Sequence, residues 1–135
     1  GLTNARAYWK QHGHLCASAA DTHAGFPIGK WLTNHRVRAR RGILDPALTQ
    51  QLDAMDPWWA PPWPSDWQRA CYTVTELVRS GHPLAPESAF AAFDDELGQW
   101  LYTQCVSYPG LAVEQRRQLA AVGLTEQTVQ TARPN

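Results

Sequence analysis

The sequence predicts an all-α fold made of two tandem three-helix bundles joined by a linker rich in tryptophan and proline. The first observation behind this prediction is an internal repeat, because Leu-Gly-Gln-Trp-Leu at residues 97–101 echoes Ile-Gly-Lys-Trp-Leu at residues 28–32. Gly42 and Gly110 keep nearly the same offset, which indicates a duplicated unit with small loop insertions. The second observation is that apolar residues recur at three-to-four spacing in both copies, as in helices that bury one face.

The first copy, residues 1–57, is expected to contain three helices. The first helix stops at Gly13 and the second at Gly42, because glycine readily adopts the left-handed conformation that ends a helix. Asp45 and Pro46 are the expected N-cap and first-turn proline of the third helix. The predicted helix ranges are 2–12, 27–41 and 46–55.

A connector at residues 58–66 separates the two copies. Its prolines forbid a helix, and its tryptophans are expected to pack on the modules and fix their relative orientation. The second copy, residues 67–124, is expected to repeat the three helices. Residues 125–135 are expected to be a frayed tail or the start of a further linker. The predicted helix ranges of the second copy are 67–80, 95–107 and 113–122.

Each copy is expected to bury an apolar stripe of its second helix. Trp31 and Trp100 occupy equivalent positions on these stripes, so both are predicted to be core anchors. His35 lies on the same stripe and is expected to be partly buried and hydrogen-bonded. The predicted structural core is Trp31, Leu32, Leu52, Trp100, Leu101 and Leu119.

The amino-acid composition limits the classes of function that the chain can have. The 12 basic and 12 acidic residues give a net charge of zero, which by itself argues against a nucleic-acid binder. The charge is unevenly split, with seven basic and five acidic residues in 1–66 and the reverse in 67–135. Three cysteines without motif spacing indicate reduced thiols in a cytoplasmic protein. No membrane span or signal peptide is predicted, and Gly1 in place of Met favours a fragment of a longer protein.

Three motifs occur in a fixed order. They are His-Gly-His-Leu at residues 12–15, Gly-Lys-Trp-Leu-Thr-Asn-His-Arg at residues 29–36, and Asp-Pro-Trp-Trp-x-Pro-Pro-Trp-Pro at residues 56–64. Together with the repeat, they resemble the helicase-associated domain, which occurs in tandem beside superfamily-2 helicase cores in bacteria, with many copies in actinomycetes. The resemblance implies Myb-like three-helix bundles, a nucleic-acid-binding role with DNA as the expected ligand, and a helicase core in the same parent chain.

The candidate nucleic-acid-binding residues lie on the second helix of the first copy. A helical wheel predicts that all of them face solvent while the aromatic stripe anchors the helix. Arginine and lysine on one helix can neutralise several phosphates, and asparagine or arginine can reach base edges in a groove. The alternative is that the run is only the solvated face of a bundle. The candidates are Lys30, Asn34, Arg36, Arg38, Arg40 and Arg41.

The second copy departs from this basic pattern. Cys105 stands where the first copy has Arg36, and Ser107 stands where it has Arg38, so a basic function is doubtful there. The carboxylates at residues 94–96 precede the helix that begins near Asp95, and stabilisation of a helix N-terminus explains them without a metal.

Two other clusters have a functional and a structural interpretation. The connector tryptophans could stack on single-stranded bases, but packing of the linker is favoured because exposed tryptophan is costly. The histidines and cysteine near the start of the chain do not have the spacing of a structural zinc site. The residues concerned are Trp58, Trp59 and Trp63 in the connector, and His12, His14, Cys16 and His23 near the N-terminus.

The sequence contains no enzymatic constellation. A Gly-x-x-x-x-Gly-Lys-Ser/Thr loop is absent, so we expect no catalysis, no cofactor, no metal and no small-molecule substrate. The predicted function is a non-catalytic accessory module that binds the phosphate backbone of nucleic acid. The alternative is a protein-interaction or structural module that docks on a helicase core or another partner, which the neutral net charge and the acidic second copy favour.

Overall fold

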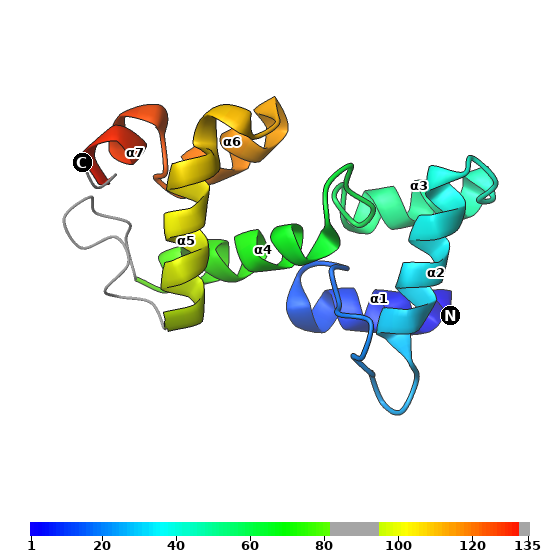
Figure 1. Cartoon of the computed structure of the whole chain (residues 1–135). Helices are drawn as coiled ribbons and strands as arrows, with labels where there is room; N and C mark the ends of the chain where they lie inside the picture. The colour runs from blue at the N-terminus through cyan, green and yellow to red at the C-terminus, as the bar shows by residue number, and fades with distance from the viewer. Residues whose placement is uncertain (82–94, 133–135) are drawn as a thin grey trace. The chain divides into compact units, whose positions relative to one another are not determined.

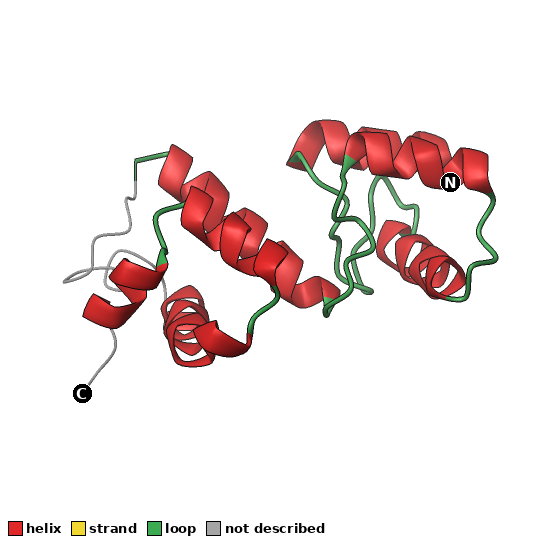
Figure 2. Cartoon of the chain, turned by 90° about the horizontal axis from the view of Figure 1, so that it is seen from above, coloured by secondary structure: helices red, strands yellow, loops and turns green. Residues whose placement is uncertain are grey.

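The computed structural model describes residues 1–81 and 95–132, and these residues are almost entirely helices and loops (Figures 1 and 2). Within them the only extended pairing is an isolated bridge between His23 and Phe26, so the prediction of an all-α fold is confirmed. The elements are α1 (Leu2–His12), α2 (Ile28–Arg40), α3 (Pro46–Met55), α4 (Ser65–Arg79), α5 (Asp95–Ser107), the 3₁₀ helix η1 (Tyr108–Gly110), α6 (Val113–Ala121) and α7 (Glu126–Ala132).

The chain divides into two compact units, Gly1–Arg69 and Ala70–Asn135. Residues 58–66, predicted to be a connector, belong to the first unit, and α4 begins in the first unit and continues in the second. The predicted organisation into two tandem three-helix bundles stays a prediction. His82 and Asp94 lie outside the described residues, and so does the rest of the loop between α4 and α5.

The core of the first unit draws on its first three helices, the loop after α1 and the start of the connector. Leu32 from α2 and Leu52 from α3 are fully buried, and they share one apolar cluster with Tyr8 from α1, Leu15 from the following loop and Trp59 from the connector. Full burial of a leucine side chain contributes roughly 2 kcal/mol. The loop and the connector are therefore structural parts of this unit.

The second unit is built around the middle of α5. Leu101 is fully buried and clusters with Val74 of α4 and with Val122, which follows α6. Leu119 of α6 and Val129 of α7 are also buried. Four helices thus contribute to the interior of this unit.

Where a frayed tail or the start of a linker was expected, Glu126–Ala132 form the helix α7. Thr125 caps this helix: its hydroxyl accepts a hydrogen bond from the Thr128 amide at 3.3 Å, and its own amide donates to Thr128 Oγ1 at 2.7 Å. Leu124 and Val129, on either side of this cap, are buried. Local capping and two apolar anchors are enough to order a helix of this length against the rest of the unit.

The connector packs as expected, with its indoles in contact with one another. Trp58 is half-buried, while Trp59 and Trp63 are only 2% and 9% exposed. The rings of Trp58 and Trp63 lie 4.9 Å apart, and Trp63 meets Trp67 edge-on at 5.6 Å. The indole N–H of Trp63 donates to Gln68 Oε1 at 3.1 Å, so the polar edge of this buried ring is satisfied.

Gly29 allows close contact between the first turn of α2 and the preceding loop. A Cβ atom at this position would overlap the backbone carbonyl oxygen of Ser18. We therefore expect Gly29→Ala to lower the free energy of unfolding by about 1–3 kcal/mol, because the backbone of the loop has to move. Urea unfolding followed by tryptophan fluorescence measures this effect. Gly110→Ala is the matched control, since a Cβ there meets open space, and an equal loss in both variants would contradict the expectation.

Candidate nucleic-acid interface

Helix α2 is rich in basic residues and contains no acidic residue. Its sequence, Ile-Gly-Lys-Trp-Leu-Thr-Asn-His-Arg-Val-Arg-Ala-Arg, contains four of the seven basic residues of 1–66. Pro27 precedes the helix with φ fixed at −77°, and Gly42 follows it with φ +70°, a conformation that glycine adopts without strain. A basic helix with defined ends is therefore presented by the unit.

Five of the six predicted binding residues are exposed on α2 or directly after it. We call them the basic face: Lys30, Asn34, Arg38, Arg40 and Arg41. On a helix of 100° per residue, Lys30, Asn34 and Arg41 lie close to one line along the axis, opposite the buried stripe. Arg38 and Arg40 lie on opposite flanks of that line. The side chains project over roughly three turns of helix, a span that covers several phosphates.

Arg36 is the exception, and the prediction that it faces solvent is wrong. It is 3% exposed, and its guanidinium donates hydrogen bonds to two backbone carbonyls. Arg36 Nε lies 2.5 Å from the carbonyl oxygen of Trp59, and Nη2 lies 2.7 Å from that of Leu15. Burial lowers the pKa of Arg36, with the nearby Cys16 and Asp56 acting in the opposite sense. This arginine joins the loop after α1 to the connector and is unavailable to a phosphate.

The error comes from where the buried stripe was centred. The predicted stripe contained Ile28, Trp31, Leu32, His35 and Ala39, but the buried residues of α2 are Ile28, Gly29, Leu32, His35 and Arg36. The true centre therefore lies near Leu32, about 100° around the helix from Trp31. This shift brings Arg36 into the interior and leaves Trp31 half-buried at the edge of the core.

Asp56 completes the buried polar cluster around Arg36. Its carboxylate is 2% exposed and accepts hydrogen bonds from the amides of Leu15 and Trp58, each at 2.9 Å. The thiol of Cys16 lies 3.7 Å from the same carboxylate, and burial, followed by the charge of Asp56, raises the pKa of this thiol. Arg36 and Asp56 thus hold the same two segments, the loop and the connector, through their backbone groups.

The histidines near the N-terminus surround an aromatic ring. The ring of His12 lies 4.1 Å from that of Tyr8, and the rings of His14 and His23 lie 6.0 and 6.3 Å from it. Nδ1 of His14 accepts a hydrogen bond from the Cys16 amide at 2.9 Å, and burial lowers the pKa of His14. No group of histidine, cysteine and carboxylate side chains in the described ranges is placed to hold a metal ion.

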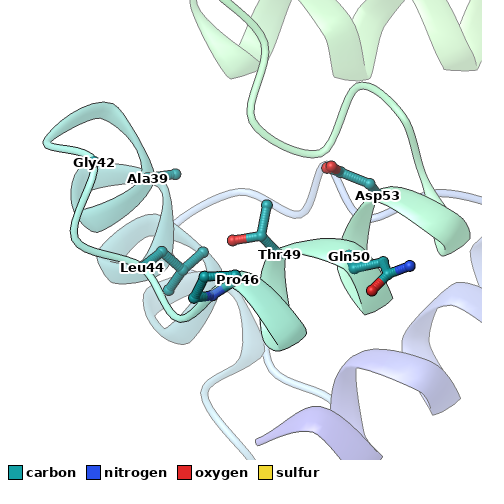
Figure 3. A pocket seen from close by; sticks show the side chains of 7 residues that line it. All are labelled: Ala39, Gly42, Leu44, Pro46, Thr49, Gln50 and Asp53. Atoms are coloured by element: carbon teal, nitrogen blue, oxygen red, sulfur yellow. The ribbon is translucent and has the colours of Figure 1, made fainter.

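Two open grooves border α2. One is formed by the prolines of the connector together with Arg40 and Trp63. The other lies between the end of α2 and α3, where Ala39, Leu44 and Thr49 line its wall (Figure 3). Asp53, the charged residue in this second groove, accepts a hydrogen bond from the indole of Trp59 at 2.7 Å. The second groove is therefore unsuited to a phosphate, whereas the first extends the surface around Arg40.

Helix α5 provides an internal comparison, because its burial pattern follows that of α2. Gln104 and Cys105 are buried at the positions that correspond to His35 and Arg36. Gln104 donates a hydrogen bond to the Trp100 carbonyl at 3.1 Å, as His35 Nδ1 contacts that of Trp31 at 2.7 Å. Trp100, like Trp31, is half-buried instead of being a core anchor.

The exposed positions of α5 differ from those of α2 in charge. Gln99, Thr103 and Ser107 are exposed where α2 has Lys30, Asn34 and Arg38. The surface that is basic on α2 is therefore uncharged at the matching positions of α5. Cys105 in place of Arg36 is a difference between two interiors and has no bearing on phosphate contact.

The comparisons with known proteins add one result. The family model described as Helicase associated domain matches residues 1–60, which include α1, α2, α3 and the first three residues of the connector. No curated protein and no solved structure matches the chain. No helix in the described part of the chain is long and apolar enough to cross a membrane.

Proposed function

We propose that the chain is a non-catalytic accessory module that binds nucleic acid beside a helicase core in the same parent protein, because residues 1–60 match the family model described as Helicase associated domain. DNA is the expected ligand. The first unit grips the phosphate backbone through its basic face, and the second unit supplies structure or spacing. Arg36 is left out of the contact set because its guanidinium is committed to backbone carbonyls.

The observation that carries the proposal is the composition of the exposed side of α2. Four cations, Lys30, Arg38, Arg40 and Arg41, are exposed without a single acidic residue on the helix. A helix face that is merely exposed to solvent commonly carries both basic and acidic side chains, because pairs of opposite charge stabilise the helix. Here the cations repel one another unless a polyanion neutralises them. A phosphate backbone provides that neutralisation and releases its own counterions.

A second function, docking on a protein partner, is favoured by a different surface. Helix α5 exposes Tyr102 and Val106, which lie four residues apart on one side of the helix, and Val113 is exposed at the start of α6. These apolar side chains are more typical of a protein contact than of a phosphate contact. The two functions use different units and are compatible.

A single substitution on the basic face tests the proposal. We expect Arg38→Ala to weaken binding to a fluorescein-labelled DNA duplex by roughly fivefold and to reduce the slope of log affinity against log salt by about 0.9, because one phosphate contact is lost. Fluorescence anisotropy across a salt series measures both quantities. Arg79→Ala is the matched control, since Arg79 is exposed on α4 and its loss changes the net charge by the same amount.

The outcome is decided by comparing the two variants. The proposal requires that Arg38→Ala lose affinity and that Arg79→Ala bind like the parent. If both variants lose the same affinity, the interaction is a response to net charge alone and α2 is not the interface. If neither loses affinity, the protein-docking function takes over.

A further inference from the structure

We infer that α2 lies in the major groove of double-stranded DNA and reads an A·T base pair with Asn34 and Val37. The inference rests on the proposed function and adds to it the kind of nucleic acid and the means of recognition. It is carried by the order in which polar, apolar and cationic side chains are arranged around the exposed side of the helix.

The exposed side of α2 has a centre and two flanks. Asn34 and Val37 lie one turn apart on the central line, and both are exposed. Arg38 and Arg40 lie roughly 80° to either side of this line. A helix inserted in a groove meets base edges with its central line and the phosphates of the two strands with its flanks. The two arginines are placed for the two strands, which a single strand would not require.

The dimensions agree with this placement. A helix of 13 residues is about 20 Å long, and the major groove, about 12 Å wide, accepts one α-helix. Lys30 and Arg41 lie at the two ends of the central line. A straight helix leaves the curved groove at its ends, so these side chains come close to the sugar-phosphate backbone of the DNA. Asn34 and Val37 are separated by about 4.5 Å along the axis, close to the 3.4 Å rise between base pairs. They therefore face the same base pair or two adjacent ones.

Val37 is the residue that phosphate binding alone does not explain. It is 38% exposed in the middle of a surface that is otherwise polar and cationic. An apolar side chain on the floor of the major groove contacts the methyl group of thymine, and asparagine bonds to N6 and N7 of adenine. The pair Asn34 and Val37 thus has the chemistry that recognises both bases of an A·T pair.

Recognition of single strands by stacking is not supported by the connector. Stacking requires an exposed aromatic face on which a base can lie. Trp59 and Trp63 are buried, and Trp58 is half-buried with its ring against that of Trp63. The connector tryptophans are therefore occupied by packing within the unit.

The test uses short duplexes whose major-groove edges are altered atom by atom. The probes are an alternating A·T duplex, a G·C duplex, and the A·T duplex with deoxyuridine in place of thymine, which removes only the methyl group. We expect the parent chain to prefer the A·T duplex over the G·C duplex by roughly fivefold or more, and to lose affinity when thymine is replaced. Val37→Ser, which replaces the apolar side chain with a polar one, should be insensitive to that replacement. Asn34→Ala should lose the preference for A·T but remain sensitive to the methyl group.

The control variant is Arg38→Ala, which should weaken binding to all duplexes equally. If the parent and the Asn34 and Val37 variants bind every duplex equally, while Arg38→Ala still weakens binding, then the groove placement is wrong and the phosphate contact stands. Tighter binding to a single strand than to its duplex also overturns the inference. If Arg38→Ala binds like the parent, the proposed function fails and the inference fails with it.

Discussion

Replacing Arg36 with alanine is expected to destabilise the first unit by about 3–5 kcal/mol. The change removes the donors of two buried carbonyls, those of Leu15 and Trp59, and takes away a cation whose charge acts on the buried Asp56. Unsatisfied buried polar groups carry the full cost of their lost hydration. Chemical denaturation followed by tryptophan fluorescence measures the loss, because the connector indoles report directly on this unit.

The control for this prediction lies on the same helix. Arg38 is exposed, so Arg38→Ala should change the free energy of unfolding by no more than about 0.5 kcal/mol. The two arginines should therefore have separate effects. Arg36→Ala should lower the free energy of unfolding, and Arg38→Ala should lower the affinity for DNA. An Arg36→Ala variant that unfolds like the parent but loses affinity for DNA would contradict the assignment of Arg36 to the interior.

The second large effect is expected from removing the three exposed arginines together. The Arg38→Ala, Arg40→Ala and Arg41→Ala triple variant should fold normally and lose about a hundredfold in affinity for duplex DNA at low salt. This figure follows from about 1 kcal/mol for each charge-assisted contact. The measurement is a titration at low ionic strength with circular dichroism as the check on folding. A loss no greater than that of Arg38→Ala alone would mean that Arg40 and Arg41 make no contact.

The helical framework could be predicted because its signals are local. Apolar spacing gave the extent of α1 and α5, and Gly13 and Gly42 marked the ends of α1 and α2 through the left-handed conformations that they adopt in the structure. Pro46 indicated the first turn of α3 for the same kind of reason. Each of these residues acts within one turn of its own position, so no knowledge of the tertiary structure was needed.

Arg36 could not be assigned from local pattern, because its environment is made by distant segments. Leu15 lies 21 residues before it and Trp59 lies 23 residues after it. A helical wheel treats arginine as a polar residue and therefore places it on the solvent-facing side of the helix. The repeat did hold a signal, since the second copy has Cys105 at the corresponding position, and cysteine is among the residues most often buried. A position that accepts both residues is more easily explained as an interior site with its own hydrogen-bond partners.

The C-terminal helix was missed for a similar reason. Its sequence is short and polar except for Val129 and Ala132, so its spacing is too weak to predict a helix. The hydroxyls of Thr125 and Thr128 form the cap, and burial of Leu124 and Val129 supplies the anchor. Tertiary packing of this kind stabilises helices that would not form alone.

The salt dependence of duplex binding tests the central claim most directly. If Lys30, Arg38, Arg40 and Arg41 each neutralise a phosphate, the plot of log affinity against log salt should have a slope of about −3.6, and the triple variant should retain a slope of about −0.9. The measurement needs only the folded chain, one duplex and a salt series. Equal slopes for the parent and the triple variant would contradict the account, because the exposed arginines of α2 would then release no counterions.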